Sequence, residues 1–340
     1  MSGIFNHEIP AIETSSPEDC YSICATRALD ADEHAAGLNH WKQDYEQLSA
    51  GLFHGTLEEI WFDNIQFFRE RTDQVVHETG QAWEGSRTVG VPIWLGNDGS
   101  FSGNQILPNS LITLGDGGEL NFRTPQHLDV LAVTVDAASL REYGEQIWQV
   151  DTEQKMPRSG LIAPPAEATN ALRQFLLMLL STLEASPKLL NYAPIRKGIE
   201  QEVFNKIVCT VNEAPEQRPA PEPGSRHRIV ALARDYQLAH SEEPVTVADL
   251  CTALKVSRRT LQYSFQAVLN VNPVAWLRAT RLNGVRRSLK AARHDPRATV
   301  SDIAARWGFW HLSAFAADYK LMFGELPSQT LRQTTPTVWH

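Results

Sequence analysis

The chain has 340 residues, of which 42% are hydrophobic and 21% are charged, and its net charge is −9. This length and composition are typical of a globular protein with two ordinary domains, and the lack of any run of eighteen apolar residues excludes a helix that crosses a membrane. The N-terminus has no basic start followed by an apolar stretch, so we expect no secretory signal. The four cysteines (Cys20, Cys24, Cys209 and Cys251) lack the spacing of a metal site, which favours a reducing cytoplasm.

The charge is divided unevenly along the chain. Residues 225–340 contain 16 Lys and Arg against 8 Asp and Glu, a balance of +8. Residues 1–224 hold the remaining 15 basic and 32 acidic residues, a balance of −17. Chance variation of the surface is one explanation, but such asymmetry indicates that the basic part meets a polyanion.

The first part of the chain predicts strands. Residues 1–35 are polar and acidic, and we expect them to be loosely ordered. Within residues about 50–135, the segments 53–71, 74–83, 88–96 and 128–136 are rich in β-branched and aromatic residues and are separated by turn signals. Many short strands at close spacing predict a small barrel or sandwich.

Helices are expected over residues about 136–212. Asp136 can cap the first of them, and a third covers about 194–212. Between them, residues 166–186 carry an apolar stripe at helical spacing, formed by Leu172, Phe175, Leu176, Leu179, Leu180 and Leu183. The stripe either covers the strands alone or also packs against a second copy of the chain.

A linker is expected over residues 213–225, because four prolines and a glycine in thirteen residues cannot hold a helix or a central strand. We therefore divide the chain into an N-terminal sensor and dimerisation domain, residues 1–212, and a C-terminal domain, residues 226–333.

Every segment after the linker predicts a helix. Thr246 and Ser257 can each cap a helix, and the short gap between Leu254 and Ser257 makes the two helices cross steeply, as in a helix-turn-helix. Pro273 suits the first turn of a long helix over about 273–292. The crossing pattern then repeats, with a cap at Thr299, a break at Gly308, a helix over 312–323 and a last helix that begins at Pro327.

The same region resembles the AraC/XylS family of regulators over residues about 228–332. The matching positions are Val300-Ser301-Asp302-Ile303-Ala304, Gly308-Phe309, Phe315, Tyr319, Phe323-Gly324 and Pro327. The resemblance implies an α+β protein with an N-terminal cupin-like β-barrel followed by helices, and a C-terminal all-α domain with two helix-turn-helix motifs. It also implies that the barrel binds a small effector and that the helices form a homodimer.

Three shorter pieces are similar to regulators of ethanolamine utilisation within that family: residues 256–262, residues 307–312 and Phe53-His54-Gly55. This similarity implies an amine as the effector. Aromatic faces beside carboxylates suit a small cationic amine, and Glu59, Trp61 and Trp94 are the candidate effector-binding residues, although such tryptophans are more often part of a core.

Two recognition helices joined by a helix of about 30 Å can enter successive segments of the major groove on one side of DNA. Ser257, Arg258, Arg259, Gln262 and Tyr263 are the predicted DNA contacts of the first helix, where arginine can bind guanine and Gln262 can bind adenine. For the second helix we predict contacts from Trp310, His311, Leu312, Ser313, Ala314 and Ala317. Trp310 either contacts the DNA backbone or packs against the protein.

Four cations along the connecting helix, Arg281, Arg286, Arg287 and Lys290, are candidates for phosphate contact, with a purely solvated face as the alternative. The second recognition helix has alanine at position 317, where the family often has arginine. Its small and apolar residues cannot make bidentate bonds to bases. We therefore expect the first half-site to be discriminated more strictly than the second.

The sequence as a whole predicts a transcription regulator, an activator, with double-stranded DNA, RNA polymerase and a small-molecule effector as partners and no cofactor. One alternative is a regulator controlled by a protein partner. Another is an enzyme with a DNA-binding tail, but His54, His77 and His127 are isolated and form no His-x-His metal motif, and no nucleophile or phosphate-loop motif is present.

Overall fold

The computed structural model describes residues 20–96, 98–215, 225–240 and 244–332. In the described part of residues 1–215, the strands form two antiparallel sheets. The larger sheet has the order β1-β3-β4-β11-β6-β9-β12, with strands Tyr21–Ala28, Gly55–Phe62, Ile65–Thr72, Leu128–Asp136, Ser86–Leu95, Leu111–Gly115 and Ser159–Ile162. The smaller sheet has the order β2-β5-β10-β7-β8, with strands Lys42–Gln47, Val76–Gln81, Leu120–Arg123, Ser100–Phe101 and Asn104–Gln105.

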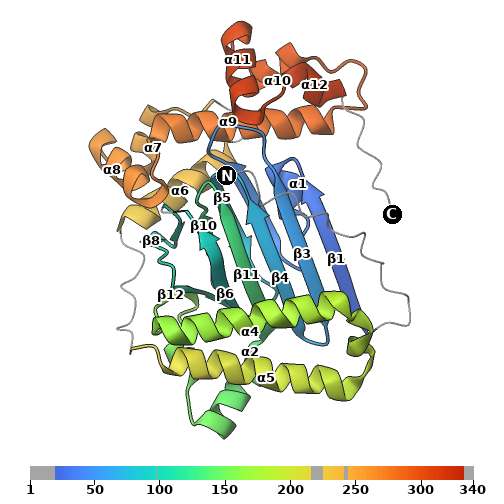
Figure 1. The fold of residues 1–340 in the computed structure, drawn as a ribbon. Coiled ribbons are helices and arrows are strands. Elements are labelled where there is room, and N and C mark those ends of the chain that lie inside the picture. Colours follow the sequence, from blue (N-terminus) through green and yellow to red (C-terminus); the bar gives the residue numbers. More distant parts are fainter. Residues whose placement is uncertain (1–19, 97, 216–224, 241–243, 333–340) are drawn as a thin grey trace.

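Helices cover one face of the larger sheet. Its outer side chains, such as Ile60, Phe67 and Val133, pack with the apolar stripe of α4 (Ala166–Ala185) and with α5 (Ala193–Asn212). Figure 1 shows α4 and α5 side by side on the side of the strands opposite the C-terminal helices. The shorter helices of this part of the chain are α1 (Ala31–Ala35), α2 (Ala137–Tyr143), a π-helix (Gly144–Trp148), α3 (Thr152–Lys155) and a 3₁₀ helix (Pro187–Asn191).

The expected α+β class is confirmed, with strands first, then helices, then a helical domain. Two details differ from the prediction. The strands form two facing sheets and not one closed barrel. They also begin at Tyr21, within the segment expected to be loose, because β1 pairs along its whole length with β3.

The C-terminal domain consists of α6 (Ser225–Ala239), α7 (Val247–Leu254), α8 (Arg258–Leu269), α9 (Pro273–Ala291), α10 (Val300–Arg306), α11 (Leu312–Phe323) and α12 (Pro327–Arg332). Each boundary has a local cause. Thr246 forms a capping box with Asp249, Ser257 and Asn272 cap α8 and α9, and Thr299 caps α10. Gly308, at φ +78°, makes the left-handed turn between α10 and α11.

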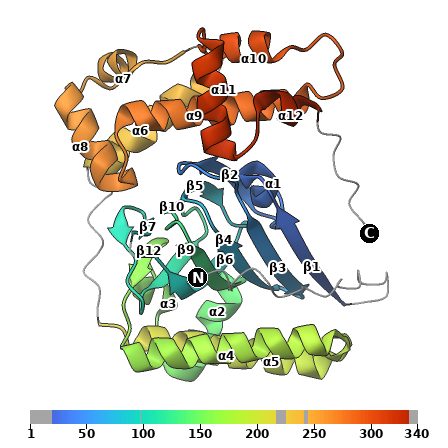
Figure 2. The ribbon, with the colours of Figure 1, turned by 45° about the horizontal axis from the view of Figure 1, so that its top comes forward.

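Two separate cores lie along α9. One joins α6, α7, α8 and the start of α9 around Leu261, Phe265 and Trp276, and the other joins the rest of α9 with α10 and α11 around Val285, Phe315 and Tyr319. Figure 2 shows α8 near one end of α9 and α11 crossing the helix farther along. The expected linker, residues 213–225, lies mostly outside the described residues, between the end of α5 at Asn212 and the start of α6 at Ser225.

Candidate DNA-binding surface

Helix α8 presents a polar face to solvent. Ser257 Oγ accepts a hydrogen bond from the backbone N–H of Thr260 at 3.1 Å, which fixes the first turn. Leu261 and Phe265 are buried in the core, so the helical period places the predicted contacts on the opposite side, where all are exposed: Ser257, Arg258, Arg259, Gln262 and Tyr263. The last four of these line one shallow hollow.

Within this face, the guanidinium of Arg259 donates to the hydroxyl of Tyr263 at 3.2 Å and lies 5.3 Å from the centre of its ring. No carboxylate among the described residues pairs with Arg258 or Arg259. The face therefore offers hydrogen-bond donors and positive charge that the described carboxylates do not neutralise.

Helix α11 presents a different chemistry. His311 Nδ1 accepts from the backbone N–H of Ala314 at 3.3 Å and so begins the helix. The predicted contacts of this unit are all exposed: Trp310, His311, Leu312, Ser313, Ala314 and Ala317. Trp310 is 87% exposed, so its ring does not pack into the domain.

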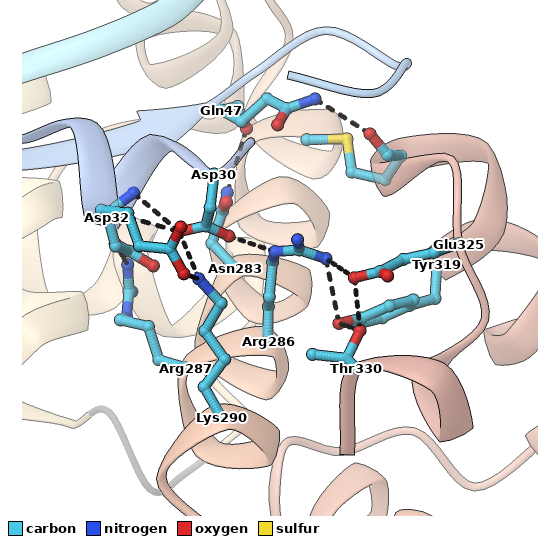
Figure 3. A network of polar contacts seen from close by, with 12 residues as sticks. Asp30, Asp32, Gln47, Asn283, Arg286, Arg287, Lys290, Tyr319, Glu325 and Thr330 are labelled. Carbon is cyan, nitrogen blue, oxygen red and sulfur yellow. Dashed lines mark hydrogen bonds and ion pairs between the residues drawn. The ribbon is translucent and has the colours of Figure 1, made fainter. Parts of the chain in front are cut away.

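The four cations of α9 divide into two groups. Arg281 lies over the ring of Phe309, 5.6 Å from its centre, and donates to the carbonyl of Leu277 at 3.3 Å. The other three, which we call the basic face of α9 (Arg286, Arg287 and Lys290), bind carboxylates of the N-terminal domain (Figure 3).

Arg286 is buried, with 6% of its surface exposed. It donates to Asp30 Oδ2 from one nitrogen and to Glu325 Oε1 at 2.7 Å from another, and it lies over the ring of Phe323. Lys290 Nζ lies 2.8 Å from Asp30 Oδ1 and 2.7 Å from Glu33 Oε1. Both oxygens of Asp30 are thus occupied by cations of α9.

Arg287 spans two further carboxylates. Its guanidinium nitrogens lie 3.1 Å from Asp32 Oδ1 and 2.8 Å from Glu46 Oε1. Asp30, Asp32, Glu33 and Glu46, on α1, β2 and the turn before α1, form what we call the acidic face of the N-terminal domain. The predicted phosphate contacts at Arg286, Arg287 and Lys290 stay a prediction that requires these ion pairs to open.

Burial and the cations opposite shift the pKa values of the carboxylates in the acidic face. Burial alone would raise the pKa of Asp30, but the charges of Arg286 and Lys290 hold that pKa below its ordinary value. Burial raises the pKa of Glu46 to about 7, against the opposing effect of Arg287. Asp30 is therefore held ionised, whereas Glu46 can take up a proton near neutral pH.

The end of β2 and the turn that follows it make further contacts with this end of the C-terminal domain. Gln47 Nε2 and the backbone N–H of Gly51 both donate to the carbonyl of Met322, at 2.9 and 3.1 Å. Asn283 Nδ2 donates to the carbonyl of Gln47 at 3.0 Å. Leu48 packs against both cores of the C-terminal domain.

A second contact joins the domains near α6 and α8. Arg234 Nη2 lies 2.6 Å from Glu119 Oε1, and Ser100 Oγ donates to the carbonyl of Val268 at 3.4 Å. The N-terminal domain thus touches each helix-turn-helix unit at a separate place.

The predicted effector residues do not form one site. Glu59 is buried and accepts hydrogen bonds from Asn39 and Gln66. Trp61 packs near Trp83, with ring centres 5.6 Å apart. Trp94 is 46% exposed and packs near His127 instead.

A cavity of about 50 Å³ lies between the two sheets, and none of those three residues lines it. Its walls are mostly apolar and include Trp41, Phe68, Phe101 and Phe122, and its polar groups are Gln43, Tyr45, Glu70, Glu78 and Thr88. Glu70 Oε1 accepts from the hydroxyl of Tyr45 at 3.0 Å and contacts His34 Nε2 at 3.0 Å.

Two acceptors beside this cavity have no partner among the described residues, namely the Oε1 atoms of Gln43 and Glu78. Burial, reinforced by the charge of Glu70, raises the pKa of Glu78 well above its ordinary value. The residues that line the cavity are not among those that the sequence predicts to bind an effector. The available signal was the presence of polar residues within apolar strands, such as Glu70 and Glu78.

In the described residues, no group of three or more His, Cys, Asp or Glu side chains could hold a metal ion. The same residues contain no helix that is both long and apolar enough to span a membrane.

Comparisons with known proteins match the C-terminal part of the chain. A family model described as "Helix-turn-helix domain" matches residues 250–333. The probable thc operon regulatory protein of Rhodococcus erythropolis is 44% identical over 105 residues, which cover 31% of each chain. A XylDLEGF operon transcriptional activator of Pseudomonas putida is 36% identical over 92 residues, which cover 26% of this chain and 27% of the activator. The chain thus spans about three tenths of these curated relatives.

Among solved structures, a probable AraC family transcriptional regulator from Rhodopseudomonas palustris is 32% identical and has a TM-score of 0.29, with 32% of this chain and 99% of that chain covered. The relatives named here regulate thc and xyl operons, and the similarity to regulators of ethanolamine utilisation stays a prediction. The sequence match over residues 250–333 falls on two capped helix-turn-helix units joined by α9, so this part of the chain is a helix-turn-helix domain similar to those of the thc and xyl operon regulators.

Proposed function

We propose that the chain is a DNA-binding transcription regulator, acting as an activator of a catabolic operon in the cytoplasm. The observation that carries this proposal is the face of α8, where Arg258, Arg259, Gln262 and Tyr263 are exposed together and no carboxylate of the described residues neutralises the arginines. These groups match the donors that bind guanine and adenine in the major groove. Helix α9 has 19 residues and spans about 28 Å, which is comparable to one turn of DNA.

The test is a genome-wide pull-down of DNA with the tagged full-length chain at two salt concentrations. We expect enrichment of one or a few promoters at both concentrations, with a site about two helical turns long. R259Q should lose this enrichment. R141Q, which removes the same charge from an exposed position on α2, should keep it. Diffuse binding that disappears at the higher salt in every variant would mean backbone attraction only and would contradict the proposal.

The regulator is further proposed to respond to a small molecule, with an amine as the ligand class, and to act as a homodimer that contacts RNA polymerase. The cavity between the sheets supports an amine, because the Oε1 atoms of Gln43 and Glu78 have no partner in the part of the chain that the structure describes and its walls carry aromatic rings. At about 50 Å³ it has room for an ammonium head group rather than for a large ligand.

Calorimetric titration of the full-length chain with alkylamines, amino alcohols including ethanolamine, and carboxylates of matched size would test the ligand class. We expect the amines alone to bind, and E78Q to weaken that binding at least tenfold while the exposed-site variant E142Q leaves it unchanged. Binding of carboxylates only would overturn the amine. Binding of no compound, with a protein captured by residues 1–212, would favour the second candidate, a regulator controlled by a protein partner.

A further inference from the structure

We propose that the acidic face of the N-terminal domain competes with DNA phosphates for the basic face of α9. The carboxylates bind the basic face while the two domains are docked, and they leave it free for phosphate when the domains separate. This inference rests on the proposed DNA-binding function and adds the means by which the N-terminal domain restrains it.

The balance of charge at the interface is the first argument. Four carboxylates, Asp30, Asp32, Glu33 and Glu46, meet three cations, Arg286, Arg287 and Lys290. A fifth carboxylate, Glu325, also holds Arg286. In the docked arrangement this segment of α9 therefore offers DNA no net positive charge, although it contributes three of the 16 basic residues after the linker.

The geometry of the contacts is the second argument. Arg286 and Lys290 each take one oxygen of Asp30 (Figure 3). Arg287 reaches two carboxylates with its two terminal nitrogens. An arginine fork and an ammonium bind phosphate oxygens through the same atoms. A duplex cannot use these nitrogens for phosphate unless it first displaces the carboxylates.

The polar nature of the docking is the third argument. Apart from the ion pairs, this end of the interface includes hydrogen bonds from Gln47, Gly51 and Asn283, and its apolar contacts include Leu48 and Leu52. Polar interfaces between domains are typical of domains that move relative to one another. The predicted base contacts on α8 and α11 stay exposed in the docked arrangement, so the restraint acts on charge and leaves those faces uncovered.

The experiment compares two full-length variants that each remove two negative charges. D32N/E33Q removes the more exposed carboxylates of the acidic face, which keeps the buried pair of Asp30 and Arg286 intact. E142Q/E145Q removes two exposed carboxylates on α2 and the π-helix, away from α9. Fluorescence anisotropy on a labelled 40-base-pair duplex of mixed sequence would give the dissociation constant of each protein between 50 and 200 mM salt.

D32N/E33Q should bind the duplex about fivefold more tightly than the wild type, because weakened ion pairs raise the fraction of separated molecules. The affinity of D32N/E33Q for DNA should also fall more steeply with salt. In the wild type, salt weakens the contacts with DNA but also opens the interdomain ion pairs that compete with DNA, so the two effects partly cancel. E142Q/E145Q should stay within twofold of the wild type. Amide hydrogen exchange without DNA should be faster in D32N/E33Q at residues 47–52.

Equal gains in the two variants would mean that only the overall charge matters, and would overturn the inference. Unchanged or weaker binding by D32N/E33Q would also overturn it, because the docked N-terminal domain would then support DNA binding. A third outcome would contradict the proposed function and not this inference. If none of the proteins binds the duplex even at 50 mM salt, the DNA-binding role itself is contradicted. The hydrogen-exchange data would then be the remaining measure of the docking.

Discussion

Asp30 and Lys290 meet at 2.8 Å across the two domains, and the same carboxylate oxygen of Asp30 accepts from the backbone N–H of Asp32 at 3.0 Å. One side chain therefore begins α1 and also holds α9. Its other oxygen binds Arg286, which is itself buried. The stability of the protein and the docking of its domains consequently depend on the same few atoms.

Replacing Asp30 with alanine should lower the free energy of unfolding by about 3 kcal/mol, because it leaves the buried guanidinium of Arg286 with one carboxylate fewer and removes the cap of α1. Urea denaturation monitored by tryptophan fluorescence would measure the loss. D32A is the matched control and should cost less than about 1 kcal/mol, since Arg287 keeps Glu46 and the pair is more exposed. Equal losses would contradict this account of Asp30.

His77 should contribute stability that is lost in mild acid, an effect opposite in sign to that of Glu46 and Glu78, whose raised pKa values favour the folded state as the pH falls. Burial lowers the pKa of its ring to about 4, although a hydrogen bond to Asn121 opposes the shift. The unfolded chain takes up the proton near pH 6.5, so the contribution of this histidine is complete above that pH and is lost as the pH falls toward 4. The loss amounts to about 2 kcal/mol at pH 5.

Urea midpoints measured between pH 8 and pH 5 would check this. Between pH 8 and pH 5 the wild type should lose about 2 kcal/mol of stability relative to H77Q, whereas H127Q, at an exposed histidine, should follow the wild type. The idea fails if H77Q and the wild type have the same pH dependence.

The two half-sites should differ in how strictly their bases are discriminated. The face of α8 carries two arginines and Gln262, while α11 presents Leu312, Ser313, Ala314 and Ala317. Single base changes in the first half-site should cost about 1–3 kcal/mol of binding free energy. Changes in the second should cost less, because small and apolar groups discriminate through methyl contact and shape. Scanning each base of a bound promoter by anisotropy would measure both, and equal losses would refute the difference.

Trp310 should contribute to the affinity for DNA and not to the stability of the fold. Its ring is 87% exposed and contacts His311, so W310A should change the unfolding free energy by less than about 0.5 kcal/mol. The same substitution should weaken binding to an enriched promoter by about tenfold if the ring lies against the DNA backbone. W276A is the contrast, since Trp276 is buried against Phe265 and its loss should cost about 3 kcal/mol of stability. Unchanged affinity of W310A would remove Trp310 from the DNA contacts.

Much of the C-terminal domain follows from local signals. Thr246, Ser257 and Thr299 were expected to cap helices, and each accepts the expected backbone hydrogen bond. Pro273 occupies the first turn of α9. Such signals are visible because a cap and its partners lie within four residues of one another.

The features that escaped prediction depend on distant residues. Asp30 and Arg286 are separated by 256 positions, and nothing near either of them indicates the other. The sequence does not predict β1, because buried and exposed side chains do not alternate regularly along Tyr21–Ala28. This segment is a strand because it pairs with β3. The strand pattern left a barrel and a sandwich both open, because alternation along a strand indicates a face and does not say which strands complete the sheet. The single barrel was implied only by the family resemblance.

The length of α9 fixes both the distance between the two helix-turn-helix units and their relative rotation about the helix axis. Each residue of an α-helix turns the chain by about 100° and advances it by about 1.5 Å. Since the two cores lie on separate stretches of α9, one inserted residue would rotate α10 and α11 by that angle relative to α7 and α8 and direct the second recognition helix away from the duplex. Substitutions on the exposed positions of α9 can be accommodated one at a time, but its number of residues cannot change without a compensating change elsewhere.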